Sequence, residues 1–270
     1  MKQSMLLCCK VYISESRNKE ALDSIERAAR RDPETVIVNK FKDHDYNRVG
    51  YNLVSYVAHD STGCPVYTPL QQSVVAMAEV AYEAINLESH CGAHPRLGVI
   101  DDIVCHPLAR ASLDEAAWLA KTIASDVGNR FQVGRLGITR NTSEKPNEGP
   151  EIASRTRGVV MIGARPWIAT YNVPILSVNV SAARRIALMV SARGGGLPTV
   201  QTLGLVHGED TTEIACMLLE PNQIGADRVQ KQVEMLAAQE GLDVEKGYFT
   251  DLSPEMIVER YMKLISTDSS

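Results

Sequence analysis

The 270-residue sequence lacks any apolar run of about 18 residues, the length that a membrane-spanning helix needs, and it lacks an excess of positive charge. Its 28 lysines and arginines stand against 33 aspartates and glutamates, which gives a net charge of −5. Such a chain offers no electrostatic attraction for nucleic acid or for an anionic membrane surface. Residues 1–10 contain a short apolar run without a small-residue cleavage pattern, so no signal peptide is predicted. We therefore expect no nucleic-acid partner and no membrane partner.

Cysteines are few and show no paired spacing. The six are Cys8, Cys9, Cys64, Cys91, Cys105 and Cys216. Cys8 and Cys9 are adjacent, so on a strand they point to opposite faces, which suits reduced core thiols better than a disulfide. Because disulfides are rare in reducing compartments, the pattern favours a cytoplasmic protein with free thiols.

What the sequence does have is an ordered alternation of strand and helix patterns in its first half. Residues 5–13 form an apolar run typical of a buried strand, and residues 17–30 carry a helical apolar stripe that Ser14 or Ser16 can cap. Further strands are predicted at 35–38, 49–57 and 98–105, and helices at 71–87 and 113–127. This β-α-β-β-α-β order is the split-βαβ pattern of ferredoxin-like layers.

A polar stretch with hardly any hydrophobic period separates the two halves. It predicts a linker at residues 135–157 between an N-terminal subdomain, 1–134, and a C-terminal subdomain, 158–270. The second half again mixes strand and helix patterns, with helices predicted at 180–192, 223–240 and 254–265. The predicted fold class is α/β (α+β): two ferredoxin-like split-βαβ subdomains, each a mixed sheet with helices on one face.

Residues 89–98, Ser-His-Cys-Gly-Ala-His-Pro-Arg-Leu-Gly, are the most informative ten residues of the chain. Gly92 and Pro95 fit badly inside a helix, so the stretch is predicted to be a loop that delivers polar groups to a strand edge. His94 is a candidate general acid–base because histidine titrates near neutral pH, and Pro95 restricts the backbone of His94. Arg96 can hold a carboxylate. On residue type alone, a purely structural histidine remains the alternative.

Two further chemistries can be read from the same region. The histidines His90, His94 and His106, with the aspartates Asp101 and Asp102, suggest zinc. The glycine and proline between the first two histidines disrupt the helix that would bring such ligands to one face, so no metal is predicted. Cys91 could be a nucleophile, but no Cys–His family signature surrounds it, and a structural thiol is the usual case.

The second half holds two arginine-containing clusters. Arg165, in a turn between two predicted strands and followed by Tyr171 and Asn172, could hold an acidic ligand; an exposed hairpin arginine is the alternative. The glycines at 194–196 could expose backbone N–H groups to an anion. A helix end that runs into a flexible loop explains them better, since no nucleotide-binding motif is present.

Several motifs occur together and in a fixed order. They are His-x-Gly-x-His-Pro-Arg-x-Gly at 90–98, Asn47-Arg48 before a strand with Tyr51, Gly-Ala-Arg at 163–165, Tyr171-Asn172, and Arg185-Ile186-Ala187 followed by a glycine-rich turn and Val200-Gln201. In this order the motifs resemble the formiminotransferase family. The resemblance covers roughly residues 5–265 and lies closest to the stand-alone plant formiminotransferase-like proteins.

The resemblance implies transfer of a formimino or formyl group between N-substituted glutamate and N5 of tetrahydrofolate. Formiminoglutamate or formylglutamate would be the second small-molecule substrate, no metal is implied, and the expected assembly is a homodimer. His94 falls on the family's catalytic general acid–base. The implied substrate- and folate-binding residues are Arg48, Arg96, Asn147, Gly149, Arg165, Tyr171 and Asn172.

The sequence also departs from the family pattern. Asn39 and Phe41 replace aspartates, Asn147 replaces the aspartate of the folate loop, and Met217 replaces an asparagine. After Val133 the family's Tyr-Leu-Tyr-Gly strand and several tens of following residues are missing, which predicts an exposed sheet edge or the loss of part of the pocket wall. These departures favour, as the alternative function, a catalytically weakened folate-binding or regulatory homologue.

Overall fold

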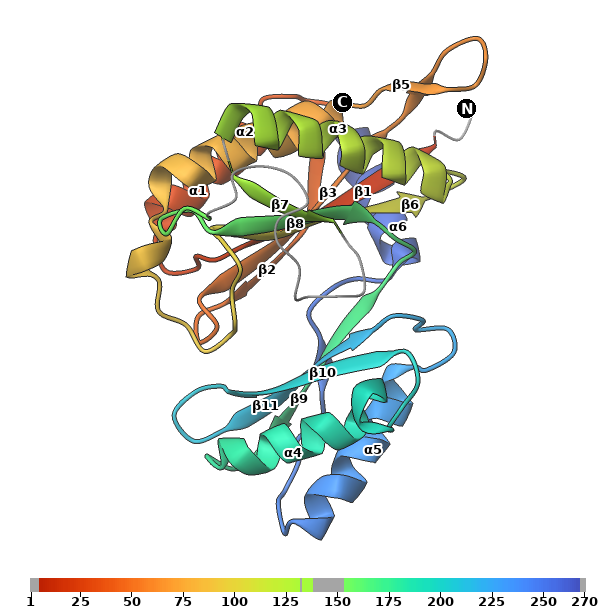
Figure 1. Cartoon of the computed structure of the whole chain (residues 1–270). Helices are drawn as coiled ribbons and strands as arrows, with labels where there is room; N and C mark the ends of the chain where they lie inside the picture. Colours follow the sequence, from red (N-terminus) through yellow and green to blue (C-terminus); the bar gives the residue numbers. More distant parts are fainter. Residues whose placement is uncertain (1–4, 132, 138–152, 268–270) are drawn as a thin grey trace. The chain divides into compact units, whose positions relative to one another are not determined.

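The structure, a computed structural model, describes residues 5–131, 133–137 and 153–267 (Figure 1). Within these ranges one unit contains residues 5–166 and 254–267, and a second unit contains residues 167–253. The chain therefore leaves the first unit after residue 166 and returns to it at residue 254.

A six-stranded sheet, in the order β2-β3-β1-β6-β8-β7, frames the first unit. Its strands are β1 (Leu6–Ile13), β2 (Val36–Asp43), β3 (Arg48–Tyr56), β6 (Ile100–Leu108), β7 (Gly134–Gly137) and β8 (Val159–Ala164). β1 pairs antiparallel with β3 and β6, whereas β8 pairs parallel with β6 and β7. A separate hairpin is formed by β4 (Ala58–His59) and β5 (Pro65–Tyr67). The order β2-β3-β1-β6 is the predicted ferredoxin-like core, extended at one edge by two parallel strands.

Three helices cover one face of this sheet (Figure 1): α1 (Lys19–Ala29), α2 (Pro69–Ala84) and α3 (Leu113–Phe131). Every second residue of β1, from Leu7 to Ile13, turns to these helices and lies in the main core, as the two-residue period of a strand requires. The fourth helix of the unit, α6 (Pro254–Thr267), contacts β2. Its buried Ile257 and Tyr261 are not part of that core, so the prediction of helices on one face holds for α1–α3 only.

The N-terminus of α1 corrects one sequence prediction. The cap is Asn18, whose side chain accepts the N–H of Ala21 at 3.1 Å. Ser14 and Ser16 instead donate their hydroxyls to the carbonyls of Gly98 and Asp43, at 2.8 and 2.6 Å. Both serines are buried and join distant segments, which a local capping rule does not anticipate.

A register irregularity interrupts the pairing of β1 with β6. Tyr12 is paired with Asp102 and Ile13 with Ile100, so Asp101 is an extra residue in β6. An extra residue of this kind is a β-bulge, which bends the strand and re-aims side chains, and bulges are over-represented beside active sites.

The second unit is built on a four-stranded sheet in the order β10-β11-β9-β12. Its elements are β9 (Ala169–Ile175), α4 (Val180–Val190), β10 (Val200–Val206), β11 (Thr212–Leu218), α5 (Ala226–Gln239) and β12 (Tyr248–Phe249). Chain order and strand order together give the predicted ferredoxin-like arrangement, with α4 and α5 packed on the same core. All the pairings are antiparallel, so the prediction of a mixed sheet is wrong for this unit.

The structure divides the chain after residue 166, whereas the sequence predicts that the second subdomain begins at residue 158. β8 pairs with β6 and β7, and α6 contacts β2, so both elements belong with the first sheet. The predicted linker also starts too early, because β7 occupies its first residues and supplies an edge strand just after Val133. Parallel pairing joins segments far apart in sequence, and the local polarity of 135–157 carries no sign of it.

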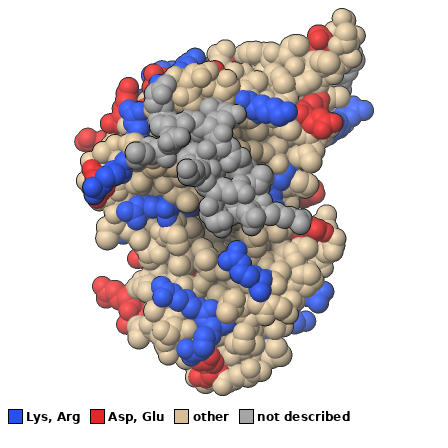
Figure 2. Space-filling model, in the orientation of Figure 1, with Lys and Arg blue, Asp and Glu red and all other residues tan. Residues whose placement is uncertain are grey.

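No helix in the described part of the chain is long and apolar enough to cross a membrane. On the face drawn in Figure 2, acidic and basic side chains are scattered among neutral ones.

Candidate active site

The loop at residues 90–98, between η1 (Leu87–Ser89) and β6, is fixed by contacts with distant segments. The carbonyl of Cys91 accepts a hydrogen bond from the Arg17 guanidinium at 2.9 Å and another from the Asn47 amide at 3.2 Å. Gly92 lies so close to the backbone of Tyr46 that a Cβ at this position would be 2.2 Å from the Tyr46 carbonyl oxygen. Only glycine tolerates this approach, so the loop is held against the β2–β3 turn.

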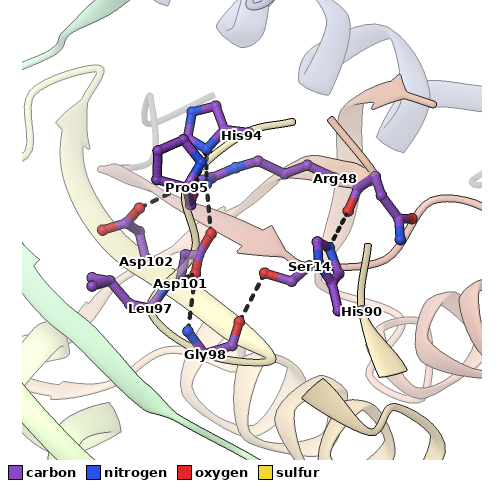
Figure 3. Close-up of polar contacts among 10 residues, drawn as sticks. Ser14, Arg48, His90, His94, Pro95, Leu97, Gly98, Asp101 and Asp102 are labelled. Atoms are coloured by element: carbon purple, nitrogen blue, oxygen red, sulfur yellow. Dashed lines mark hydrogen bonds and ion pairs between the residues drawn. The ribbon is translucent and has the colours of Figure 1, made fainter. Parts of the chain in front are cut away.

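His90 belongs to this support. Its Nε2 lies 3.0 Å from the carbonyl of Asn47, and the imidazole N–H donates to that oxygen (Figure 3). Asn47 itself has a left-handed backbone with φ of 49°, a conformation that asparagine tolerates better than most residues. His90 therefore stabilises the turn that precedes Arg48 rather than facing His94.

Arg48, the first residue of β3, links the loop to β6. Its Nη1 donates to Asp101 Oδ2 at 2.5 Å and lies 3.2 Å from His94 Nδ1, while its Nη2 donates to Asp102 Oδ2 at 3.2 Å (Figure 3). Consecutive residues of a regular strand point to opposite faces, so the bulge at Asp101 is what lets both carboxylates reach one guanidinium.

Asp101 is the most enclosed member of this cluster, with a side chain that is 3% exposed. Its second oxygen accepts the backbone N–H groups of Leu97 and Gly98, at 2.6 and 3.1 Å. One carboxylate thus connects Arg48 to the end of the loop that carries His94. A buried charge needs such complete pairing, since an unpaired one is strongly destabilising.

Two tyrosine rings complete the surroundings. The Arg48 guanidinium carbon lies 4.8 Å from the centroid of the Tyr12 ring, a cation–π arrangement. Gly50, paired with Tyr12 across the strands, leaves room for this ring, because a Cβ there would be 2.9 Å from it. The Tyr46 ring meets the His94 ring edge-on, with centroids 5.3 Å apart. Arg48 and His94 are therefore restrained by packing as well as by hydrogen bonds.

The contacts of His94 define its tautomer. Its Nδ1 lies 2.6 Å from the carbonyl oxygen of Pro95, which can only accept, so Nδ1 carries the hydrogen and donates. Arg48 cannot then donate to the same nitrogen, and its Nη1 bond goes to Asp101 instead. The lone pair of His94 is consequently on Nε2, which has no hydrogen-bond partner among the described residues.

Burial and the neighbouring charge of Arg48 lower the pKa of His94 to about 4. Both causes disfavour the imidazolium, so His94 is neutral at physiological pH, with a base at Nε2. Asp102 shifts in the opposite direction: burial, together with the nearby Asp101, raises its pKa to about 6, although Arg48 opposes the change. At neutral pH the cluster therefore combines one arginine and two aspartates with an uncharged imidazole.

We expect a nitrogen NMR titration to show this state directly. The His94 ring should remain neutral from pH 8 down to about pH 5, with the pattern of an Nδ1–H tautomer, and should protonate near pH 4. In Arg48→Met the pKa should move upward, because the cation that repels the imidazolium is gone. A midpoint near 6.5 in the parent protein, or an Nε2–H tautomer, would contradict the assignment.

The other predicted site residues of the first unit are Arg96 and Arg165. Arg96 is exposed at the end of the His94 loop, and Arg165 follows β8. Partial burial lowers the pKa of Arg165, and its backbone N–H donates to the carbonyl of Cys105. Arg48, predicted as a substrate-binding residue, is already paired with two carboxylates.

Tyr171 and Asn172 lie on β9 in the second unit, on opposite faces of the sheet. Tyr171 is buried in the helix-covered core, and its hydroxyl donates to Gln230 at 2.9 Å. Asn172 is also buried and donates its amide to Glu213, which accepts the Tyr248 hydroxyl as well. The two remaining predicted residues, Asn147 and Gly149, lie outside the described residues.

The three histidines considered for zinc are not assembled into one site within the described ranges. His90 binds the carbonyl of Asn47, His94 that of Pro95, and His106 Nδ1 that of Arg165, at 2.9 Å. Each histidine is thus engaged with a different backbone carbonyl. Cys91 is exposed, and its role in the described contacts is through its backbone carbonyl.

Sequence reasoning missed the roles of Asp101, Asp102, Tyr12 and Tyr46. Asp101 and Asp102 entered only as possible zinc ligands, although two adjacent carboxylates opening an apolar strand signal a special environment. Tyr12 and Tyr46 give no local signal, since only the strand pairing and the β2–β3 turn bring them to Arg48 and His94.

Comparisons with known proteins agree with the resemblance seen in the sequence. The family model "Formiminotransferase domain, N-terminal subdomain" matches residues 6–138. A formiminotransferase cyclodeaminase-like protein of Arabidopsis thaliana is 44% identical over 98% of this chain and 99% of its own length. A glutamate formimidoyltransferase of Thermoplasma acidophilum is 23% identical over 97% of this chain and 94% of its own. A formimidoyltransferase-cyclodeaminase of Sus scrofa is 25% identical over 93% of this chain, which spans half of that longer protein. The chain belongs to the formiminotransferase family.

Proposed function

We propose that this protein is a folate-dependent transferase that moves a formimino or formyl group between N-substituted glutamate and N5 of tetrahydrofolate. The names of its relatives support the reaction class. The observation that carries the proposal is the neutral His94, held by its Nδ1–H with the lone pair on Nε2. A base of this kind, fixed in a polar cluster, suits proton transfer to and from nitrogen.

In the proposed reaction N5 of tetrahydrofolate attacks the formimino carbon, and His94 Nε2 takes the proton that N5 loses. A carbon–nitrogen bond to folate forms, and a tetrahedral adduct results. The imidazolium then returns the proton to the glutamate nitrogen as the bond from that nitrogen to the carbon breaks. The low pKa of His94 makes its imidazolium a strong acid for this second step.

The arginines divide into two proposed roles. Arg48 holds the two aspartates, because its donors are already used there, and through Asp101 it supports the loop that carries His94. Arg96 and Arg165 bind the carboxylates of the substrates, for which arginine is geometrically suited. Asn147, Gly149 and Asn172 remain proposed folate or substrate contacts. For Tyr171, enclosed in the core, we propose a packing role. A cytoplasmic homodimer completes the proposal.

The test measures both turnover and binding with the purified protein. We expect formation of a 5-substituted tetrahydrofolate from tetrahydrofolate and N-formiminoglutamate, and calorimetric binding of 5-formyltetrahydrofolate. Binding without turnover would instead favour a weakened folate-binding or regulatory homologue, the alternative suggested by Asn147 and Met217. Absence of both binding and turnover would refute the proposed function and this alternative together.

A further inference from the structure

We propose that Asp102 selects the one-carbon donor, favouring a cationic formimino group over a neutral formyl group. This deepens the proposed function, on which it rests, by naming the donor class that the site prefers. The charges around His94 support this preference, and so does the one carboxylate oxygen of that cluster that no described residue uses.

Asp102 is placed to meet a ligand. Its Oδ2 is bound to Arg48, but its Oδ1 accepts no hydrogen bond from any described residue. The side chain is 20% exposed, whereas that of Asp101 is 3% exposed and saturated by Arg48 and two backbone N–H groups. Asp102 is therefore the member of the aspartate pair that can still accept a donor from outside.

The cluster also has an uncompensated charge. Arg48 neutralises only one of the two carboxylates that it contacts, and the neutral His94 adds nothing. No other arginine or lysine pairs with Asp101 or Asp102 among the described contacts. This cluster of four side chains thus carries about one net negative charge, in surroundings where water screens it less than at the surface.

The two possible donors respond to that charge in opposite ways. A formimino group is an amidine, which is basic and, when protonated, is a cation with N–H donors that match a carboxylate. A formyl group is a neutral amide that offers a carbonyl oxygen, an acceptor, and attack on it builds negative charge on that oxygen. Attack on the protonated amidine instead neutralises the positive charge of the donor. A net negative site therefore favours the amidinium and disfavours the developing oxyanion.

Arg48 does not reverse this preference. Its guanidinium is stacked on Tyr12 and its Nη atoms already donate to both aspartates, so an oxyanion would have to compete with two carboxylates for them. The same guanidinium lies 3.2 Å from His94 Nδ1 and 3.2 Å from Asp102 Oδ2, so the proposed base and the proposed donor contact adjoin one group.

The experiment compares N-formimino-L-glutamate with N-formyl-L-glutamate in the parent protein, in Asp102→Asn and in Asp102→Glu. We measure kcat/KM for transfer to tetrahydrofolate and, without folate, the calorimetric Kd of each donor. Asparagine keeps the shape but removes the charge, so the ratio of formimino to formyl kcat/KM should fall about 10- to 100-fold, with a parallel weakening of formimino binding. Glutamate should restore part of the ratio. The matched control is Asp23→Asn on α1, an exposed residue paired with Lys19, which should leave the ratio unchanged.

An equal loss for both donors in Asp102→Asn would overturn the proposal, because a residue that merely positions His94 affects both reactions alike. A parent protein that binds the formyl donor as tightly as the formimino donor would overturn it too. The binding comparison separates this inference from the proposed function. Suppose that the protein shows no turnover but that Asp102→Asn loses the preference for the formimino donor in binding. This result would support the role of Asp102 and refute the transferase activity.

Discussion

His94→Gln should transfer the formimino group about 10²- to 10⁴-fold more slowly than the parent protein, the range typical of a removed general acid–base. Glutamine retains polarity and approximate size but cannot take the proton from N5 or return it to the glutamate nitrogen. The loss corresponds to roughly 3–5 kcal/mol of transition-state stabilisation. It should appear in kcat, with the donor Kd nearly unchanged, because the contacts proposed for donor binding are on Asp102, Arg96 and Arg165.

The matched control for this variant is His44→Gln. His44 is exposed in the β2–β3 turn and acts in the described contacts through its backbone carbonyl, which accepts from Arg17. The turnover of His44→Gln should equal that of the parent protein. A His94→Gln variant that is within a few fold of the parent, while the control behaves as expected, would remove His94 from the proposed mechanism.

Arg48→Met should lower the free energy of unfolding by about 3 kcal/mol, because it leaves Asp101 and Asp102 without their counter-ion. For a chain of this size such a loss corresponds to a fall in Tm of roughly 5–10 °C. Methionine can still cover the Tyr12 ring, so the effect isolates the charge. Thermal unfolding at pH 7.5 measures it.

A second substitution tests whether the unpaired carboxylates cause the loss of stability in Arg48→Met. In Arg48→Met combined with Asp102→Asn, part of the lost Tm should return, since one of the two abandoned charges is removed. Arg48→Lys should lie between parent and Arg48→Met, because it retains the charge without the guanidinium fork. A Tm loss in Arg48→Met of less than about 2 °C, or an additive loss in the double variant, would show that the cluster does not stabilise the fold.

The local elements were predictable from the sequence because their signals are local. The apolar stripe of α1 and the helix patterns of α2, α4 and α5 all lie near the expected positions. The order of these elements was enough to identify the ferredoxin-like layers. The loop of residues 90–98 was equally visible, since glycine and proline in its interior exclude a helix.

What sequence reasoning could not find depends on contacts between distant segments. Strict alternation along β6 would separate Asp101 from Asp102, and the bulge that brings both to Arg48 is detectable only from the register with β1. The assignment of β8 failed for a similar reason, since its partners β6 and β7 are known only once the sheet is assembled. The burial of Tyr171 could not be predicted either, because a strand residue faces the core or the open side according to a register that the sequence does not display.

The return of α6 to the first sheet makes the second unit an insertion within the first. Two chain crossings, after residues 166 and 253, join it to its host. Cleavage at either crossing divides the chain into two polypeptides, and the second unit then stays covalently attached to only one of the two host segments. A fragment that stops at residue 253 would retain the whole of the second unit and yet strip the helix from β2. A truncation near the C-terminus would therefore damage the unit that carries His94, although most of that unit comes from the first 166 residues.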